Sequence, residues 1–526
     1  MQPAPVLISG QWRAATAVET FLAQSPALVA PIAGEPFPVS GWSDIDAALA
    51  AAAQAAPAMR ALPGARLASF LDHYAGLVEA AASELVAAAH AETALAIRPR
   101  LAEVELPRTV NQLRMAADAA RRATWQAPTI DTKLNIRSCL APLGPVWVFG
   151  PNNFPFAFNS VAGGDFAAAI AAGNPVIAKA HPSHPGTTRL LAALALAAVE
   201  ETDLPPGAVQ MLYAMRFADG ERAIADPRTA AVAFTGSRSA GLKLKAVADA
   251  AGKPIYLEMS SVNPVVILPG ALDERPEAVA QDYVTSALVG CGQFCTNPGL
   301  VLLLAGAATE TFVDTVAARF RAAPVGTLLS VAVADHLAAG VARLREAGAE
   351  ALAGGTPGGG SGHSYANTLL RVSGARFLEK STALQTEVFG PASLMVVAAN
   401  EQELCQAIER LEGNLTGTIY SATGGADDAL YDLVAPLVRR RVGRLLNDKM
   451  PTGVAVSPAM QHGGPYPATG HPGFTAVGIP ASLRRFAGLE CYDAVRPERL
   501  PPLLANHNPL AAWRFVDGQW TLAEII

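Results

Sequence analysis

From Leu143 onward the chain alternates short β-prone runs with helical stretches, and this alternation restricts the possible folds more than any other feature of the sequence. The expected strands of this first series lie at 145–149, 175–178, 209–213, 230–234 and 255–258. Strands separated by helices form a parallel sheet, and ligands bind at the loops on its carboxyl edge. We therefore expect an α/β fold.

A second alternating series runs from about residue 265 to 447, which predicts a second sheet-based domain. The 526 residues are too many for one hydrophobic core, and the 51% hydrophobic residues supply enough apolar surface for more than one. The first third is helix-rich, with apolar residues at helical spacing in 44–59, 65–90 and 102–123. We expect the charged side chains of the last of these helices to face solvent: Glu103, Glu105, Arg108, Arg114, Arg121 and Arg122.

Charge and hydropathy patterning exclude several classes of protein. The formal net charge of -6 argues against a nucleic-acid partner, because such proteins usually present a basic face. Residues 1–15 lack the basic start and apolar stretch of a signal peptide, so we expect a cytoplasmic protein. The uncharged run 283–309 carries Gln293 and Asn297 in its middle, which favours a buried strand–turn–strand over a membrane helix.

The cysteine pattern favours a reducing compartment and argues against a metal centre. The chain has an odd number of cysteines, most of them far apart, as expected without a disulfide framework. They are Cys139, Cys291, Cys295, Cys405 and Cys491. Cys291 and Cys295 are four residues apart, but no neighbouring histidine or cysteine completes a zinc site. We therefore expect no metal.

Two side chains in the middle of the chain have the character of catalytic groups. The segment Gly290-Cys-Gly-Gln-Phe-Cys-Thr-Asn-Pro-Gly299 places Cys295 on a glycine-flanked loop, where a thiolate could attack a carbonyl carbon. Glu258 ends an apolar strand, and apolar surroundings raise the pKa of a carboxyl group towards that of a general base. The alternatives are an inert buried cysteine and a surface ion pair.

Three further elements fall at the carboxyl ends of the same predicted strands. Asn153, in the turn after the first strand, could donate a hydrogen bond to a developing oxyanion, although Asn also favours turns for local reasons. Lys179 ends the second strand. The turn Phe234-Thr-Gly-Ser-Arg-Ser-Ala-Gly241 would present backbone N–H groups at a helix start, which suits a phosphate group.

In order and in spacing, these motifs resemble the aldehyde dehydrogenase superfamily. The spacing of Glu258, Cys295 and Glu387 is close to that usual in the family. The matching elements are Asn153 in Pro-x-Asn-Phe-Pro, the strand-end Lys179, Phe234-Thr-Gly-Ser237, Leu257-Glu258, Gly292-Gln-Phe-Cys295 and Glu387-Val-Phe-Gly-Pro391.

The resemblance implies a fold of two Rossmann-like α/β domains plus an oligomerisation arm. On this interpretation, 1–126 and 142–268 bind NAD(P), and 269–459 form the catalytic domain that carries the cysteine. Residues 127–141 and 460–526 form the arm and the C-terminal tail. A homodimer or homotetramer is implied as well.

The resemblance also implies the chemistry, which is oxidation of an aldehyde to a carboxylic acid. Cys295 would attack the aldehyde, Asn153 and the Cys295 backbone N–H would hold the oxyanion, and Glu258 would activate water to hydrolyse the thioester. The implied cofactor contacts are Lys179, Phe234, Gly236, Ser237, Glu387 and Phe389.

Three segments resemble the branch that oxidises α-ketoglutaric semialdehyde (2,5-dioxovalerate): 179–186, 258–264 and 462–469. Many family members have a Glu three residues after the strand-end lysine, where this chain has Pro182. Without that carboxylate a 2′-phosphate would not be repelled, so NADP is expected, with NAD possible. Arg216 and Arg238 are the candidates for the phosphate contact.

The substrate contacts are less constrained by the sequence. Phe156 and Tyr466 are candidates for the substrate tunnel, and a dicarboxylic semialdehyde would need a cation at its far end, for which Arg444 and Lys449 are among the possibilities.

Two alternative functions stay open from the sequence. The first is a long-chain fatty aldehyde dehydrogenase. The second, from another class, is a cysteine hydrolase or acyl transferase. Such enzymes usually pair Cys with His. The histidines at His181, His184, His462 and His471 stand in no recognisable Cys-partner motif, which argues against the second alternative.

Overall fold

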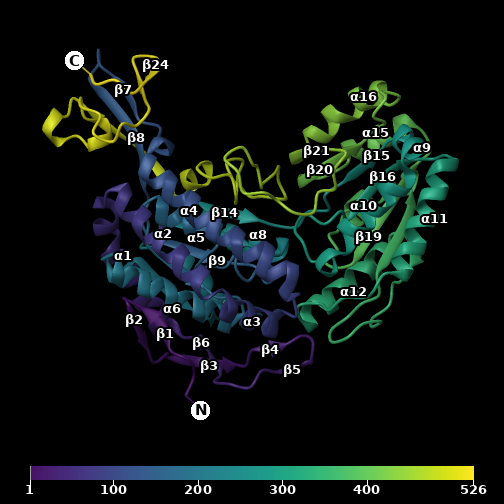
Figure 1. Ribbon diagram of the computed structural model, residues 1–526, viewed down its shortest axis with the longest axis horizontal. Helices are drawn as coiled ribbons and strands as arrows, with labels where there is room; N and C mark the ends of the chain where they lie inside the picture. The colour runs from purple at the N-terminus through teal and green to yellow at the C-terminus, as the bar shows by residue number, and fades with distance from the viewer. Residues whose placement is uncertain (1, 526) are drawn as a thin grey trace.

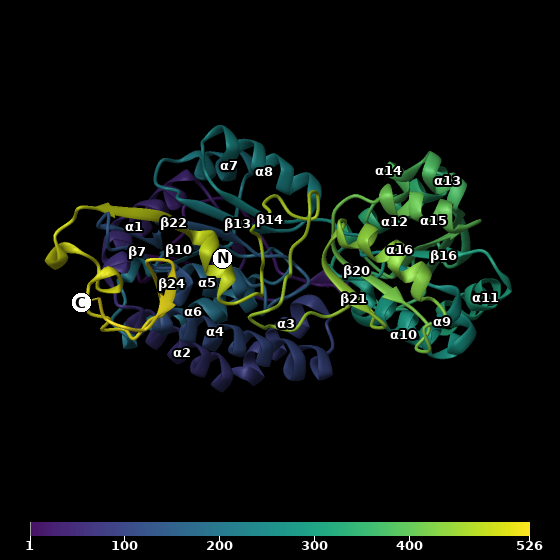
Figure 2. The same ribbon diagram turned by 90° about the horizontal axis from the view of Figure 1, so that it is seen from above.

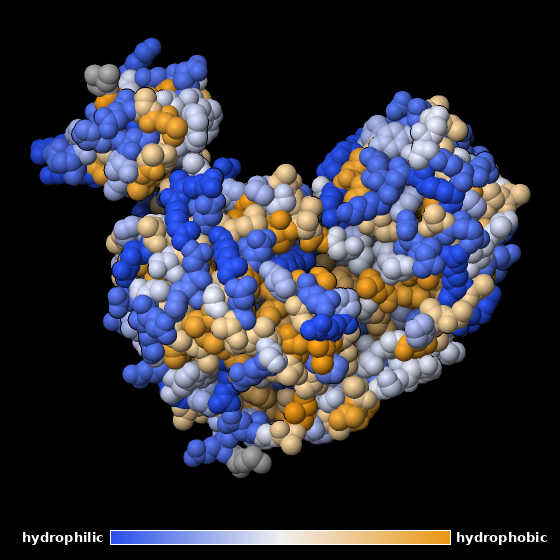
Figure 3. Space-filling model, in the orientation of Figure 1, coloured by the Kyte–Doolittle hydropathy of each residue, from blue (hydrophilic) through white to orange (hydrophobic). Residues whose placement is uncertain are grey.

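The computed structural model describes residues 2–525, which form two large lobes and a small sheet that projects from one of them (Figure 1). Each lobe is built on a seven-stranded sheet with helices on its faces. The α/β fold with two sheet-based domains expected from the alternating pattern is confirmed. A surface view shows a hollow between the two lobes (Figure 3).

The first sheet has the strand order β14-β13-β9-β10-β11-β1-β2. Its first five strands are parallel, and the two N-terminal strands add antiparallel to the edge. The bounds are β1 Val6–Ile8, β2 Gln11–Arg13, β9 Val146–Phe149, β10 Val176–Lys179, β11 Val209–Leu212, β13 Ala231–Thr235 and β14 Ile255–Glu258. The strand order reverses at β9, so the loop after β9 opens into the crevice where α/β sheets bind ligands.

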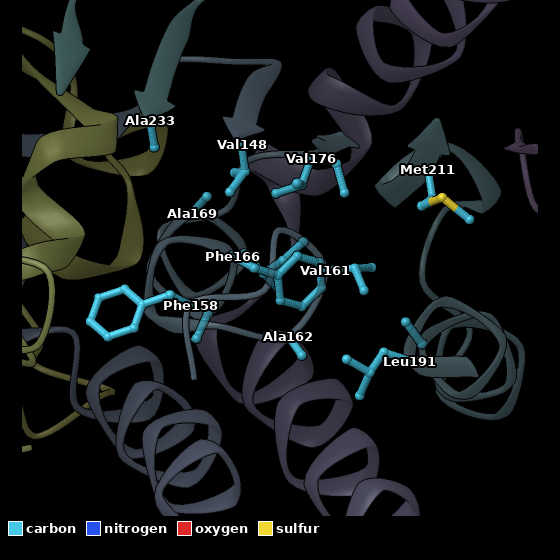
Figure 4. Packing of buried hydrophobic residues seen from close by; sticks show 14 of the residues in the cluster. Val148, Phe158, Val161, Ala162, Phe166, Ala169, Val176, Leu191, Met211 and Ala233 are labelled. Atoms are coloured by element: carbon cyan, nitrogen blue, oxygen red, sulfur yellow. The ribbon is translucent and has the colours of Figure 1, made fainter. Parts of the chain in front are cut away.

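Helices cover both faces of the first sheet. Helices α5 and α6 pack on one face, with α2 and α4 outside them, while α1, α7 and α8 lie on the other face. The bounds are α1 Trp42–Ala61, α2 Gly64–Ala80, α3 Ala82–Thr93, α4 Leu106–Arg122, α5 Gly164–Ala171, α6 Pro185–Glu201, α7 Phe217–Ala225 and α8 Arg238–Ala250. Figure 4 shows the core beneath the strands, where Phe166 lies among Val148, Val161 and Leu191.

The charged face predicted for 102–123 is only partly exposed. Arg114, Arg121 and Arg122 form surface ion pairs, as expected of a solvated face. Glu105, by contrast, has no exposed surface, and Arg108 is largely buried. The chain here passes through the helical segment η1 (Ile97–Glu105) into α4, and this path turns both side chains inward towards the loop after β9. The prediction was wrong for these two residues.

The second sheet has the order β17-β18-β19-β16-β15-β20-β21, parallel except for β17. The strand bounds are β15 Val265–Ile267, β16 Leu300–Leu304, β17 Glu350–Ala353, β18 Thr368–Ser373, β19 Ala392–Ala398, β20 Asn414–Tyr420 and β21 Val442–Asn447. The helix bounds are α9 Pro269–Glu274, α10 Pro276–Leu288, α11 Ala307–Ala322, α12 Val331–Glu346, α13 Gly374–Glu379, α14 Ser381–Leu384, α15 Glu401–Glu409 and α16 Asp428–Arg439. Because β15 belongs to this sheet, the domain boundary lies between 258 and 265 and not at 268.

The uncharged run 283–309 is not a strand–turn–strand. Its first residues are the end of α10, and only β16 is a strand. Periodicity alone does not separate a buried helix from a buried strand in an apolar run, and Pro276 supplies the helix start seven residues upstream of Tyr283. Among residues 2–525, every helix is too short or too polar to cross a lipid bilayer.

A third sheet, with the order β22-β8-β7-β23-β24, joins the predicted arm to the end of the chain. The bounds are β7 Thr129–Asp131, β8 Ile136–Pro142, β22 Ala487–Asp493, β23 Arg514–Val516 and β24 Gln519–Thr521. The predicted division placed residues 460–526 with the arm. The tail, however, does more than supply strands to this sheet. Residues 453–480 first run between the two lobes, and only then does the short helix η5 (Ala481–Phe486) lead into β22 (Figure 2).

The remaining described elements are short. Two small sheets pair β12-β6-β3 and β4-β5. The bounds are β3 Ala17–Phe21, β4 Gln24–Ser25, β5 Ala30–Pro31, β6 Phe37–Ser40, β12 Ala214–Met215, η2 Thr124–Gln126, η3 Pro206–Ala208, η4 Val289–Gly292, η6 Pro497–Arg499 and η7 Pro502–Leu504.

A buried ion pair fastens the tail to the first domain. Arg485 Nη1 of η5 lies 2.7 Å from Asp165 Oδ1 of α5, and both side chains are buried. Removing one partner of such a pair leaves an uncompensated charge in the interior, so Asp165→Ala should lower the free energy of unfolding by about 3–5 kcal/mol. Chemical denaturation followed by circular dichroism measures this change.

The matched control is the exposed pair of Arg114 and Glu79, 2.7 Å apart. Glu79→Ala should cost less than about 1 kcal/mol, because solvent screens exposed pairs. Equal effects of the two substitutions would show that the Arg485–Asp165 pair does not hold the tail.

Candidate functional site

The cysteine predicted to be the nucleophile lies on a constrained loop between η4 and β16. Gly292 has φ +64°, and a Cβ there would lie 2.1 Å from the Gly390 carbonyl oxygen, so only glycine fits. The Asn263 side chain donates hydrogen bonds to the carbonyl oxygens of Cys295 at 2.8 Å and of Asn297 at 2.9 Å. Gln293 accepts a hydrogen bond from the Leu329 N–H at 2.9 Å. The loop thus fixes Cys295 through its own backbone.

Glu258 and Cys295 meet through a third residue, His462. Glu258 ends β14 and is 1% exposed, and its Oε1 is hydrogen-bonded to His462 Nε2 at 3.0 Å. The same Nε2 atom lies 3.6 Å from Cys295 Sγ. One ligand-type atom from each of the three side chains lies within 4.8 Å of the other two. The structure therefore brings the predicted nucleophile and the predicted base together around one imidazole.

His462 was not predicted as a partner of the cysteine, and the histidines were wrongly set aside on this point. His462 stands 167 residues after Cys295 and reaches it because the tail folds back between the lobes. Backbone contacts dock this segment on β14: Met259 N–H donates to Ala468 O at 2.8 Å, and Glu258 bridges to Thr469. The segment 462–469 was noticed for its resemblance to one branch, but nothing local indicated its distance from the thiol.

These surroundings favour the protonated, neutral form of the Cys295 thiol. Burial is the main cause that raises the pKa of Cys295 well above its ordinary value, and the charge and hydrogen bond of Glu258 raise it further. Arg108 acts in the opposite direction, because its positive charge lowers the pKa of the thiol. A thiolate therefore forms only when a neighbouring group takes the proton, and His462 and Glu258 are in place to do so.

Asn153 lies in the loop after β9, at the switch point of the first sheet, where the sequence predicted it. Its Nδ2 donates to the Gln293 carbonyl oxygen at 3.0 Å, which places the amide beside the nucleophile loop. Its backbone carbonyl accepts a hydrogen bond from Arg100 Nη2 at 2.9 Å. An Asn amide has two donor hydrogens, so the second remains for an oxyanion formed at Cys295.

The other four cysteines are unpaired. Burial raises the pKa of Cys139 to about 11 and that of Cys291 to about 12. Of the two cysteines on the glycine-flanked loop, only Cys295 touches a histidine among the described residues.

Three of the predicted cofactor residues, Ser237, Arg238 and Glu387, line one cleft between the domains. Ser237 and Arg238, at the start of α8, face Glu387 and Thr386 of the second domain across it. Ser237 caps α8 by accepting from the Ala240 N–H at 3.4 Å. Glu387 and Phe389 also line an adjoining pocket. The start of a 13-residue helix and a buried carboxylate are groups that suit a phosphate and a ribose hydroxyl.

Lys179 and Glu387 titrate close to neutrality because both are buried. Burial lowers the pKa of Lys179, at the end of β10, to about 8. Burial also raises the pKa of Glu387 to about 7, although hydrogen bonds from Ser260 and Ser261 partly offset this. Phe234 and Gly236 stand at the end of β13 and directly after it, and the Gly236 N–H donates to the Glu258 carbonyl at 3.1 Å. Lys179, Phe234 and Gly236 thus lie at the carboxyl edge of the first sheet, whereas Glu387 belongs to the second domain.

The two arginines predicted to contact a phosphate are engaged with carboxylates. Arg216 follows β12, is exposed and pairs with Glu19 at 2.7 Å. Arg238 pairs with Glu412 at 2.7 Å at the mouth of the cleft. Both pairs are accessible to solvent, so exchange for another anion costs little.

The two predicted substrate contacts do not meet at the nucleophile. Phe156 is 0% exposed and belongs to the core of the first domain. Tyr466 is 61% exposed and lies near Arg238, on the cofactor side. The aromatic residues beside Cys295 are instead Phe154 and Phe294, whose rings pack edge to face at 5.5 Å and line a surface pocket together. Phe154 stands two residues before the predicted Phe156 in the loop after β9.

The proximity of Glu258 to Cys295 predicts how the thiol responds to pH. The rate at which iodoacetamide alkylates Cys295 should rise with pH, with an apparent pKa above that of a free cysteine. Glu258→Gln removes the negative charge that disfavours the thiolate, so this apparent pKa should fall and alkylation at pH 7 should become faster. Mass spectrometry of the Cys295 peptide over a pH series measures the rate, and Glu84→Gln on the exposed face of α3 is the control. An unchanged or higher apparent pKa in Glu258→Gln would contradict the geometry.

Solved structures similar to this one share its fold along nearly the whole chain. The PnpE protein of Pseudomonas sp. WBC-3 superposes with a TM-score of 0.80 at 21% identity, covering 94% of this chain and 99% of that one. Lactaldehyde dehydrogenase of Escherichia coli superposes with a TM-score of 0.78 at 24% identity, covering 93% and 98%. At these sequence identities, both similarities establish the fold alone.

Sequence comparison identifies the family. The sequence model of the aldehyde dehydrogenase family matches residues 12–431. Alpha-ketoglutaric semialdehyde dehydrogenase 2 of Azospirillum brasilense is 40% identical over 99% of this chain and 100% of its own length. Alpha-ketoglutaric semialdehyde dehydrogenase of Acinetobacter baylyi is 37% identical over 91% of each chain. The chain therefore belongs to the aldehyde dehydrogenase family and is an NAD(P)-dependent oxidoreductase that acts on aldehydes.

Proposed function

We propose that this protein oxidises α-ketoglutaric semialdehyde (2,5-dioxovalerate) to 2-oxoglutarate, with Cys295 as nucleophile, Glu258 as the base that activates water, and Asn153 as oxyanion donor. The contact of Cys295 Sγ and Glu258 Oε1 with His462 Nε2 is the observation that carries the catalytic part. The names of the two relatives with 40% and 37% identity support the substrate.

The first step forms a bond between Cys295 Sγ and the aldehyde carbon. The thiol proton passes to the pair formed by His462 and Glu258, whose Nε2 and Oε1 atoms lie 3.0 Å apart, with Nε2 3.6 Å from the sulfur. The carbonyl oxygen becomes an oxyanion, which accepts hydrogen bonds from the Asn153 amide and the Cys295 backbone N–H. Losing one such donor typically reduces the rate by about 10²–10³-fold.

The second step converts the thiohemiacetal into a thioester. When bound, the nicotinamide cofactor takes up the hydride that leaves the substrate carbon. Lys179 and Glu387 would hold its ribose hydroxyls, and the start of α8 together with Ser237 would hold its phosphates. Phe234, Gly236 and Phe389 shape the walls of the same site.

In the last step Glu258 removes a proton from a water molecule that attacks the thioester. Glu258 Oε2 is buried and has no hydrogen-bond partner among residues 2–525, so it is free to accept from that water. The carbon–sulfur bond breaks, the acid leaves and Cys295 recovers its proton from His462.

NADP is the proposed cofactor, with NAD as a second substrate of the same site. Pro182 stands in the turn after β10 where a carboxylate would exclude a 2′-phosphate. Arg216 follows β12, which comes directly after β11 in the chain, and β11 pairs with β10 so that Leu212 lies opposite Lys179. Arg216 therefore lies at the same sheet edge, and Arg238 lies at the cleft on the other side of β9. Either arginine can exchange its surface carboxylate for the phosphate.

A homodimer or homotetramer is the proposed assembly. The third sheet has two free edges within the described chain, β22 and β24, and their exposed apolar side chains include Leu489 at 71% and Trp520 at 57%. Exposed edges of this kind pair readily with another chain.

The assay that tests the proposal compares cofactors and substrates on the full-length protein. Reduction of NADP with α-ketoglutaric semialdehyde, followed by absorbance, should proceed with kcat/KM about tenfold or more above that with NAD, because an arginine–phosphate contact is charge-assisted. Cys295→Ala should reduce this rate by at least about 10³-fold while cofactor still binds, as measured by calorimetry.

Two outcomes would contradict the proposal. Turnover of an ester or thioester that needs no nicotinamide cofactor, without aldehyde oxidation, would favour the cysteine hydrolase that the Cys295–His462 contact also permits. Preference for a long-chain aldehyde over the semialdehyde would favour the fatty aldehyde alternative.

A further inference from the structure

The pocket beside the nucleophile holds positive charge. It is lined by η1 and α4, by the loops that carry Asn153 and Cys295, and by the chain at 453–456. The lining residues that matter here are Arg100, Glu105, Arg108, Phe154, Phe294 and Val454. Because Phe154 follows Asn153 and Phe294 precedes Cys295, this pocket adjoins the loop that carries the thiol.

Glu105 is the only carboxylate among the lining residues of this pocket, and both of its oxygens already have partners. Glu105 Oε1 accepts the backbone N–H groups of Phe156 at 2.8 Å and Ala157 at 3.1 Å. Its Oε2 is paired with Arg100, which also donates to the Asn153 carbonyl. The charges of Glu105 and Arg100 therefore compensate each other, and Glu105 is not available as an anionic partner for Arg108.

Arg108 has no anionic partner among the described residues. Its Nε donates to the neutral Gln112 Oε1 at 3.1 Å, and this is its one hydrogen bond to them. Its Nη2 is shielded from solvent and has no partner. The guanidinium stacks near the rings of Phe154 and Phe158, 5.7 and 5.2 Å from their centres. A buried cation of this kind is costly unless something binds it.

The burial of this cation affects the acid–base chemistry of the site. Burial lowers the pKa of Arg108, and the charge of Arg108 in turn lowers the pKa of Cys295. The guanidinium therefore lies within electrostatic reach of the reacting sulfur.

The two cations named from the sequence are less suited to contact the substrate. Lys449 is exposed. Arg444 is half-buried, and it holds the chain at 451–453 through the carbonyl oxygens of Pro451 at 2.7 Å and Gly453 at 3.3 Å. Arg444 thus positions the opposite wall of the pocket and adds positive potential, with both of its Nη atoms already engaged.

We propose that Arg108 binds the carboxylate at the far end of the substrate and so selects aldehydes that end in an acid group. The inference rests on the proposed function and names its specificity-determining residue. The aldehyde carbon sits at Cys295, the chain of the substrate passes alongside the paired rings of Phe154 and Phe294, and the carboxylate meets the unpartnered guanidinium nitrogen. An uncharged long-chain aldehyde would leave the same cation unpaired.

The test measures a ratio of two kcat/KM values, one for α-ketoglutaric semialdehyde and one for uncharged pentanal, with the same cofactor. Arg108→Met keeps the length and the contact with the aromatic rings but removes the charge. The ratio should fall about 10²-fold, because truncating one partner of a buried charged pair costs a factor of this order. Arg108→Lys should recover part of the ratio, since it restores the charge without the fork.

Arg122→Met is the matched control, because Arg122 lies on the same helix but is exposed and paired with Asp118. Its ratio should equal that of the wild type. An equal loss for both substrates in Arg108→Met would make Arg108 a structural residue and overturn the proposal. Failure of the wild-type enzyme to oxidise either aldehyde would instead refute the proposed function.

A measurement on the wild-type enzyme alone does not depend on whether the variants fold. Glutarate and pentanoate differ by one carboxylate, and each can be tried as an inhibitor competitive with the aldehyde. Glutarate should bind at least about tenfold more tightly. Equal inhibition by the two acids would also overturn the assignment of Arg108.

Discussion

The structure depends on one buried contact, in which the imidazole of His462 lies between the thiol of Cys295 and the carboxylate of Glu258. Each of the three groups comes from a different part of the chain. Glu258 ends the first sheet, Cys295 precedes β16 of the second sheet, and His462 belongs to the tail that runs between the lobes. The contact forms only if both domains and the tail are in place, so the folding of the whole chain and the chemistry of the site are coupled.

Burial gives this contact its reactivity. Desolvation disfavours the charged forms of acids and bases, and the pKa values of Cys295, Glu387 and Lys179 all shift in the direction of their neutral forms. Protons then pass between neighbouring side chains rather than to and from water. The positive charge of Arg108 acts on the same thiol. One arginine could therefore both favour the thiolate and attract the anionic end of a substrate.

Much of the fold followed from the sequence, because local patterns and local motifs determine it. The alternation after Leu143 predicted both parallel sheets, and motif order pointed to Asn153, Glu258 and Cys295, which the structure brings together. Three features could not be predicted in this way. His462 meets Cys295 only through tertiary folding, and Arg108 and Glu105 turn inward from a helix whose charged face looks solvated. The third is the helix at the start of 283–309, where an apolar run fits either a helix or a strand.

The central claim is that Cys295 becomes acylated and that Glu258 brings about its release. Glu258→Gln can be mixed with α-ketoglutaric semialdehyde and NADP, quenched with acid and digested, and its cysteine peptides weighed by mass spectrometry. The account predicts that the acyl group accumulates as a thioester on Cys295 to near one per chain, while wild type retains little. An acyl group on Cys291 or on no cysteine, with aldehyde oxidation still proceeding, would contradict it.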